Sequence, residues 1–145
     1  MIMRFMRVSV LGALVFASVL AAGCGDDTTT TSTPITPPSA NVTDTFTGTL
    51  TPSGATTHPF VVQSSGAVQA TITVLSPDTT TQVGIALGIW TSVSSCQVVV
   101  ANDKASQGTS VLGTATGNGA LCVRIFDSSG VLPQAESYQI DVSHP

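Results

Sequence analysis

The chain has 145 residues, of which 42% are hydrophobic and 8% are charged, and its formal net charge is −4. With four Lys and Arg residues it cannot neutralise a row of phosphates, which excludes nucleic-acid binding. The same scarcity of charge disfavours a helical cytosolic protein, whose solvated helix faces need Glu and Lys.

The first 23 residues have the composition of a secretory signal peptide. Arg4 and Arg7 precede an apolar run over 8–23, which is shorter than the roughly 20 residues of a membrane-spanning helix. The run ends in Leu20-Ala21-Ala22-Gly23-Cys24, which resembles the lipobox of bacterial lipoproteins, with the Leu one position further from the Cys than is usual. The resemblance implies cleavage before Cys24 and fatty acids such as palmitate on this residue. The alternatives are an ordinary signal peptide with a free thiol, or a transmembrane helix.

Residues 24–43 are expected to form a lipidated linker. The segment is rich in Thr, Ser and Pro and cannot build a core, so it predicts an extended tether that reaches up to about 60 Å. Cleavage leaves two basic residues against eight carboxylates, a net charge of −6, so the lipid must hold the protein at the membrane. Gly25 in place of an Asp after the acylated Cys implies the outer membrane by the lipoprotein resemblance.

Residues 44–145 are predicted to form an antiparallel β-sandwich of the jelly-roll or immunoglobulin type. Apolar residues recur at every second position, as in Val68, Ala70, Ile72 and Val74, which is typical of strands with one buried face. Turn signals separate the runs, and no helical period is present. The expected strands lie near residues 45–50, 57–62, 67–75, 82–90, 95–101, 110–115, 120–126 and 137–143.

Cys96 and Cys122 are expected to form a disulfide, because export places them in an oxidising compartment. They close a 27-residue loop, which the chain-entropy relation values at roughly 3–4 kcal/mol. The alternative, a pair of metal-binding thiols, lacks both a Cys-x-x-Cys spacing and a nearby His. No metal ion and no cofactor is therefore expected.

The chain offers no recognisable catalytic set, so no catalytic residue is assigned. A hydrolase needs a nucleophile, a base and an orienting acid, but His58 is expected at a strand edge and His144 in a frayed tail. Glu136 is the single Glu and is expected in a loop, so the carboxyl pair of a glycosidase is missing. The scattered aspartates are expected to cap turn amides and not to bind calcium; they are Asp78, Asp103 and Asp127.

Three further side chains have an expected structural role, and Trp90 and Arg124 also allow a binding role. Trp90 ends a strand, where it is a weak candidate for a sugar-binding platform or, alternatively, closes the end of the core. Tyr138 continues an apolar alternation and is expected in the core. Arg124 is expected to reach outward and pair with a carboxylate such as Asp127 or Asp103, or alternatively to bind a partner.

Several segments of the β region share a pattern of apolar spacing and glycine. They are Phe46-Thr-Gly48-Thr-Leu50, His58-Pro-Phe60-Val-Val, the run 66–74, and the closing segments 120–127 and 138–142. Over residues 46–142 the chain resembles the bacterial pre-peptidase C-terminal domain. The resemblance implies a β-sandwich that assists secreted proteases in secretion, solubility or substrate attachment and performs no chemistry. No protease domain accompanies it in these 145 residues.

These features together predict a non-enzymatic, lipid-anchored cell-envelope protein whose β-sandwich is a binding or structural module. The expected partners are the membrane, through the lipid on Cys24, and an envelope polysaccharide or protein. One alternative is a surface-displayed carbohydrate-binding module that uses Trp90. Another is an accessory subunit of a secreted hydrolase.

Overall fold

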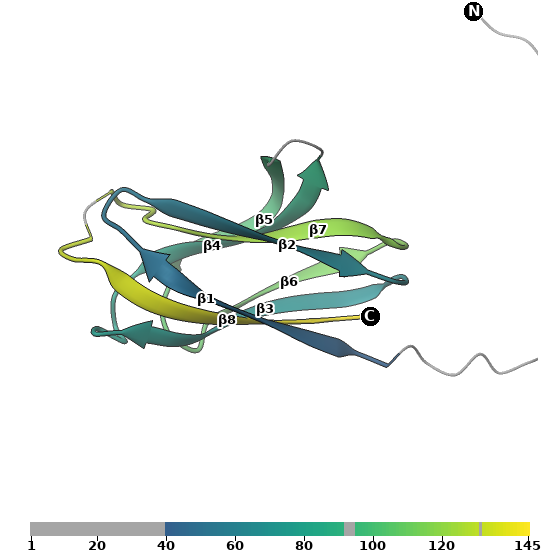
Figure 1. Cartoon of the computed structure of the whole chain (residues 1–145), viewed down its shortest axis with the longest axis horizontal. Helices are drawn as coiled ribbons and strands as arrows, with labels where there is room; N and C mark the ends of the chain where they lie inside the picture. The colour runs from purple at the N-terminus through teal and green to yellow at the C-terminus, as the bar shows by residue number, and fades with distance from the viewer. Residues whose placement is uncertain (1–39, 92–94, 131) are drawn as a thin grey trace, which may run out of the picture. The chain divides into compact units, whose positions relative to one another are not determined.

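The computed structural model describes residues 40–91, 95–130 and 132–145, so the predicted signal peptide, Cys24 and most of the linker lie outside it. In this part the chain forms two four-stranded antiparallel sheets that pack face to face (Figure 1). The strands are β1 (Val42–Leu50), β2 (Ala55–Val62), β3 (Gly66–Ser76), β4 (Val83–Thr91), β5 (Ser95–Ala105), β6 (Ser110–Ala115), β7 (Gly119–Phe126) and β8 (Glu136–His144). The described segments contain no helix of the length and apolarity that membrane crossing requires.

The predicted β-sandwich is confirmed, and each of the eight expected strands is present. Alternation in the sequence becomes alternation in burial: Val68, Ala70 and Ile72 of β3 are buried, whereas the intervening Gln69 is exposed. Strand β4 departs from this rule, because all residues from Val83 to Gly88 are buried. Both faces of β4 are therefore covered over this stretch.

The strand order is that of a jelly roll and not that of an immunoglobulin fold. Sheet A has the order β1-β8-β3-β6 and sheet B the order β2-β7-β4-β5, so successive strands alternate between the sheets up to β4 and again after β5. The hydrogen-bonded pairs β1–β8, β2–β7, β3–β6 and β4–β5 are those of an eight-stranded roll. The core between the sheets consists mainly of Val, Ile and Leu, with Ile72, Ile85, Ile125 and Ile140 among the fully buried residues.

The two long sides of the sandwich are closed differently. On the β1–β2 side, a row of rings fills the space between the sheets: Phe46 stacks on His58 at 4.9 Å, and Phe60 lies 5.2 Å from His144. Gly48 makes room for this row, because a Cβ atom there would lie 2.5 Å from the Tyr138 hydroxyl. On the opposite side the edge strands are β5 and β6, and no comparable row of rings lies between them in the described residues.

Strand directions place one group of features at the same end of the sandwich. Cα partners in the sheets are Val42 with His144, Val62 with Gly119, and Ile89 with Leu121. The start of β1, the carboxyl terminus, the β6–β7 turn and the β4–β5 hairpin therefore share this end. The chain enters the domain at Val42, so the linker joins the domain at this end too.

Candidate functional site

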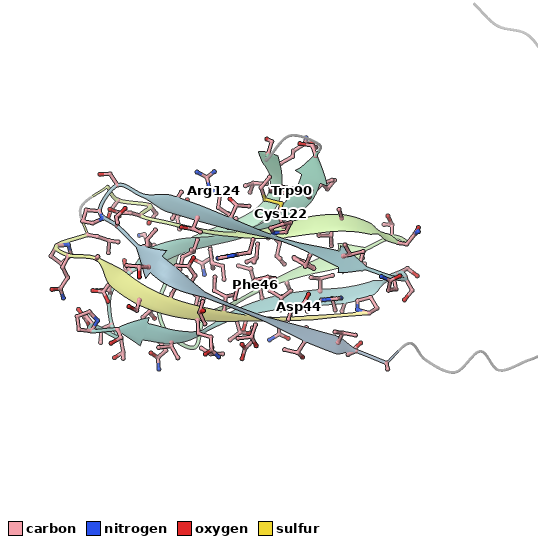
Figure 2. All side chains as sticks on the ribbon, in the orientation of Figure 1. Asp44, Phe46, Trp90, Cys122 and Arg124 are labelled. Atoms are coloured by element: carbon pink, nitrogen blue, oxygen red, sulfur yellow. A yellow bond between two sulfur atoms is a disulfide. The ribbon has the colours of Figure 1, made fainter. Side chains whose placement is uncertain are left out.

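The β4–β5 hairpin departs from the plane of sheet B. The β4–β5 register shifts between Leu87 and Gly88, and beyond this point the hairpin rises from sheet B on the side away from sheet A (Figure 1). Cys96 of β5 and Cys122 of β7 are joined by a disulfide, with 5.9 Å between their Cα atoms (Figure 2). Strands on either side of a third strand are normally about 10 Å apart. The start of β5 therefore folds over the outer face of β4, and the predicted disulfide is confirmed in an unexpected place.

Gly88 makes this crossing possible. A Cβ atom at Gly88 would lie 2.3 Å from the carbonyl oxygen of Gln97 and 3.0 Å from Sγ of Cys96. The first contact is with backbone, which cannot rotate away. The absence of a side chain at this position thus allows β5 to lie against β4 where the disulfide spans it.

A groove opens between the hairpin and the β6–β7 turn, because β5 turns away from sheet A. It has a volume of about 520 Å³, which is within the range of small-ligand pockets. We call it the hairpin groove. Its walls come from both sheets and consist of Val62, Val68, the β4 segment 87–90, Val99 and Val100 of β5, and residues 113–121 of β6, the turn and β7.

The hairpin groove is apolar and carries no charged side chain. Leu87, Ile89 and Val100 supply aliphatic surface, and the polar side chains on its wall are those of Thr114, Thr116 and Asn118. Trp90 lies on this wall, is half-buried and is not among the residues of the core cluster. The arrangement suits an apolar ligand better than one that needs many hydrogen bonds.

The rim of the groove exposes further aliphatic surface. Val99 is 70% exposed, Ile89 48% and Val98 43%. Adjacent valines are both exposed because the raised hairpin has solvent on both faces. We call Ile89, Trp90, Val98 and Val99 the hairpin patch. The signal for it in the sequence is the run Val98-Val99-Val100, which breaks the alternation expected of a strand with one buried face.

The outer face of sheet B beside the hairpin holds Arg124, and its expected ion pair is absent. The guanidinium carbon lies 5.4 Å from the centre of the Phe126 ring, in a cation–π contact, and no carboxylate of the described residues pairs with it. Phe126 in turn covers Gly84, where a Cβ atom would lie 2.3 Å from the ring. The prediction of a pair with Asp127 or Asp103 was wrong, because ring and guanidinium stack along one face of β7.

His58 is held within the row of rings, where its contacts are with Tyr138 and Phe46. Its Nε2 atom is 2.8 Å from the hydroxyl of Tyr138, and its ring stacks on Phe46. Burial lowers the pKa of His58 and raises the pKa of Tyr138, the latter opposed by a hydrogen bond with Thr56. Tyr138 is buried, as expected, and its hydroxyl finds a partner across the two sheets.

The expectation that His144 lies in a frayed tail was wrong. His144 ends β8, is buried, and its Nε2 atom is 3.1 Å from Oδ2 of Asp44 while Nδ1 faces the Pro145 carbonyl at 3.3 Å. The carboxyl terminus is held by pairing of β8 with β1 and by a hydrogen bond from the Gln63 amide to the Pro145 carbonyl. Both ring nitrogens of this His therefore have partners.

The aspartates in the turns cap backbone amides. Oδ2 of Asp127 accepts hydrogen bonds from the amides of Ser53 and Leu132, and Oδ1 accepts from Gly130 N–H and the Ser129 hydroxyl. Burial acts to raise the pKa of Asp127, but these hydrogen bonds outweigh it and lower the pKa to about 2.

Asp78 has the same role in the β3–β4 loop. It accepts from the amide and the hydroxyl of Thr80, and these bonds lower its pKa. The expectation that Asp103 caps a turn amide was wrong, since this residue belongs to β5.

The expectation that Glu136 lies in a loop was also wrong. It is the first residue of β8, is fully buried, and accepts a hydrogen bond from the Asp78 amide at Oε2, while Oε1 has no partner among the described residues.

Within the described residues, no three His, Cys, Asp or Glu side chains lie close enough to hold a metal ion. Comparison of the chain with protein-family models and with curated proteins found no match to either.

Proposed function

We propose that this protein is a non-enzymatic, lipid-anchored module of the bacterial cell envelope that binds an apolar ligand in the hairpin groove. The observation that carries the proposal is the groove itself. It is a cavity of about 520 Å³ with an aliphatic wall and no charged side chain, held open by a disulfide-linked hairpin. The resemblance of residues 46–142 to an accessory domain that performs no chemistry supports the same view.

The contacts of the two histidines support a role without catalysis. A general base must reach a proton on the substrate with a free ring nitrogen. Nε2 of His58 is bonded to Tyr138 inside the row of rings, and both nitrogens of His144 face acceptors. Neither His borders the hairpin groove, which lies on the opposite side of the sandwich.

The anchor is tested by metabolic labelling with a radioactive fatty acid. We expect the wild-type chain to carry label and to fractionate with membranes, and the Cys24→Ser variant to carry none. An unlabelled wild-type protein that fractionates with the soluble periplasm would contradict the proposed anchor, whatever the groove binds.

Groove binding is tested by filling the groove. Gly113 lies on its wall, and a Cβ atom there would be 3.6 Å from Leu87, an ordinary contact that leaves room for a larger side chain pointing inward. We expect an apolar fluorescent probe to bind the wild type and shift the emission of Trp90, and Gly113→Leu to abolish this binding. Leu112→Phe is the matched control, because this neighbour points outward from the same strand. Equal probe binding by Gly113→Leu and wild type would refute the groove as the site.

A carbohydrate-binding module is the second candidate, because Trp90 does lie on a groove wall. A sugar would find one aromatic side chain there and the side chains of Thr114, Thr116 and Asn118 as hydrogen-bond partners. A glycan array with wild type and Trp90→Ala distinguishes the two. Binding that is lost in Trp90→Ala would favour the sugar, and absence of binding by both proteins would remove it.

A further inference from the structure

The hairpin patch is the most prominent apolar projection of the described domain. Its exposed aliphatic side chains lie on both strands of one hairpin, which is raised from the sheet (Figure 1). The segment from Gly88 to Asn102 contains no charged residue. The other exposed large apolar side chains lie singly on different strands; they are Val42, Val61, Val74 and Leu112.

The proposed lipid anchor makes the bilayer the surface that lies close to the hairpin patch. The chain enters the domain at Val42, and Cys24 lies 18 positions earlier. A Thr- and Pro-rich segment of that length reaches up to about 60 Å, which exceeds the length of a nine-residue strand at roughly 3.3 Å per residue. The tether therefore keeps the domain beside the bilayer without dictating which side faces it, and the surface chemistry of the domain decides.

The distribution of charged residues also favours the hairpin as the part of the domain that contacts the membrane. Residues 40–145 carry six carboxylates against two basic residues, a net charge of −4, so the domain as a whole is repelled by anionic head groups. The hairpin segment from Gly88 to Asn102 is uncharged and combines aliphatic side chains with the sole Trp of the chain. Trp is favoured at the boundary between head groups and hydrocarbon, because one part of its ring system is apolar and its N–H is polar.

We propose that the hairpin patch inserts into the interfacial layer of the lipid bilayer to which the protein is anchored, so that the apolar ligand of the hairpin groove is membrane lipid. This inference rests on the lipid anchor proposed above and adds a second, protein-borne membrane contact. Insertion is shallow, since β5 is an edge strand whose outward backbone groups need water or head groups as partners.

The single Trp makes the contact directly measurable. The full acylated chain is reconstituted with phosphatidylcholine vesicles in which a fraction of the lipid carries bromine, either near the head group or near the end of the acyl chain. Flotation of the vesicles reports the anchor. Quenching of Trp90 emission by bromine reports the hairpin patch, so failure of the anchor and failure of this inference give different results.

We expect wild-type protein to float with the vesicles and to lose emission with shallow bromine, and to lose less with deep bromine. Val99→Asp should float equally and show the emission of bromine-free vesicles. Val99→Ser, which adds no charge, should lie between the two. Leu112→Asp is the matched control: its position is 65% exposed against 70% for Val99, and it lies on the outer face of sheet A, so quenching should equal that of wild type.

Three results would overturn the inference. The first is flotation without quenching in the wild type. The second is quenching that Val99→Asp and Leu112→Asp reduce equally. The third is cross-linking of the vesicle-bound protein into dimers through the hairpin while Trp90 stays unquenched, which would assign the patch to a second copy of the chain. Intact disulfide and unchanged melting temperature show that each variant is folded.

Discussion

Gly88 provides the sharpest test of how the hairpin is built. Its substitution by Ala adds a single methyl group on the outer face of β4, where β5 crosses. The new Cβ atom would lie 2.3 Å from the Gln97 carbonyl oxygen, 2.8 Å from its carbon and 3.0 Å from Sγ of Cys96. Contacts below 3.0 Å do not occur for real Cβ atoms, so β5 must move away from β4.

The cost follows from what this movement breaks. Overpacking against a rigid backbone costs about 1–3 kcal/mol. Separation of the strands also weakens the hydrogen bonds around the Gly88–Val98 pair, each worth about 1 kcal/mol. We expect Gly88→Ala to lower the free energy of unfolding by about 3 kcal/mol, which for a domain of this size lowers the melting temperature by about 15 °C.

The assay is thermal unfolding followed by circular dichroism, with alkylation under denaturing, non-reducing conditions to count free thiols. Gly117→Ala is the control, because a Cβ atom there meets nothing within 4 Å and the change should alter stability by less than about 1 kcal/mol. Should Gly88→Ala melt like wild type with its disulfide intact, β5 cannot lie over Gly88 as described.

Three further predictions concern the disulfide and the pH dependence of stability. Replacing Cys96 and Cys122 together by Ser should lower stability by roughly 3–4 kcal/mol, as the entropy of a 27-residue loop requires; unchanged denaturation midpoints in urea would contradict this. Because burial lowers the pKa of His58, the unfolded chain takes up the proton first, so stability is full above pH 6.5 and falls as the pH decreases below it. His58→Gln should flatten this decline in urea titrations between pH 7.5 and 5, and an identical slope would refute the assignment. The pKa of Asp127 is lowered from 3.8 to about 2, so its stabilising contribution is present above pH 3.8 and is lost as the pH falls towards 2. Asp127→Asn should remove that acid-dependent loss and, at pH 7, should destabilise the chain, because the backbone N–H groups of Ser53, Gly130 and Leu132 donate to two carboxylate oxygens and the NH2 group of Asn cannot accept in place of one of them.

The sequence by itself determined the fold class, the number of strands and their positions. These properties depend on local chemistry: side chains alternate across a strand, so the pattern of Val68, Ala70 and Ile72 reports a buried face without knowledge of its partner. The pairing of Cys96 with Cys122 could also be predicted, since no other cysteine follows the predicted cleavage and acylation site. The lipid predicted on Cys24 likewise depends on a short local motif, residues 20–24.

Only the tertiary structure decided where the chain departs from an ideal sandwich. The register shift at Gly88, the path of β5 over β4 and the resulting groove depend on contacts between strands that are distant in sequence. The burial of Glu136 and His144 has the same origin, because β8 pairs with β1 and β3 and carries both residues into the interior. Strand periodicity is a property of one segment, whereas a groove is a property of the space between segments. A sequence pattern therefore predicts the strands, and the site follows only from their packing.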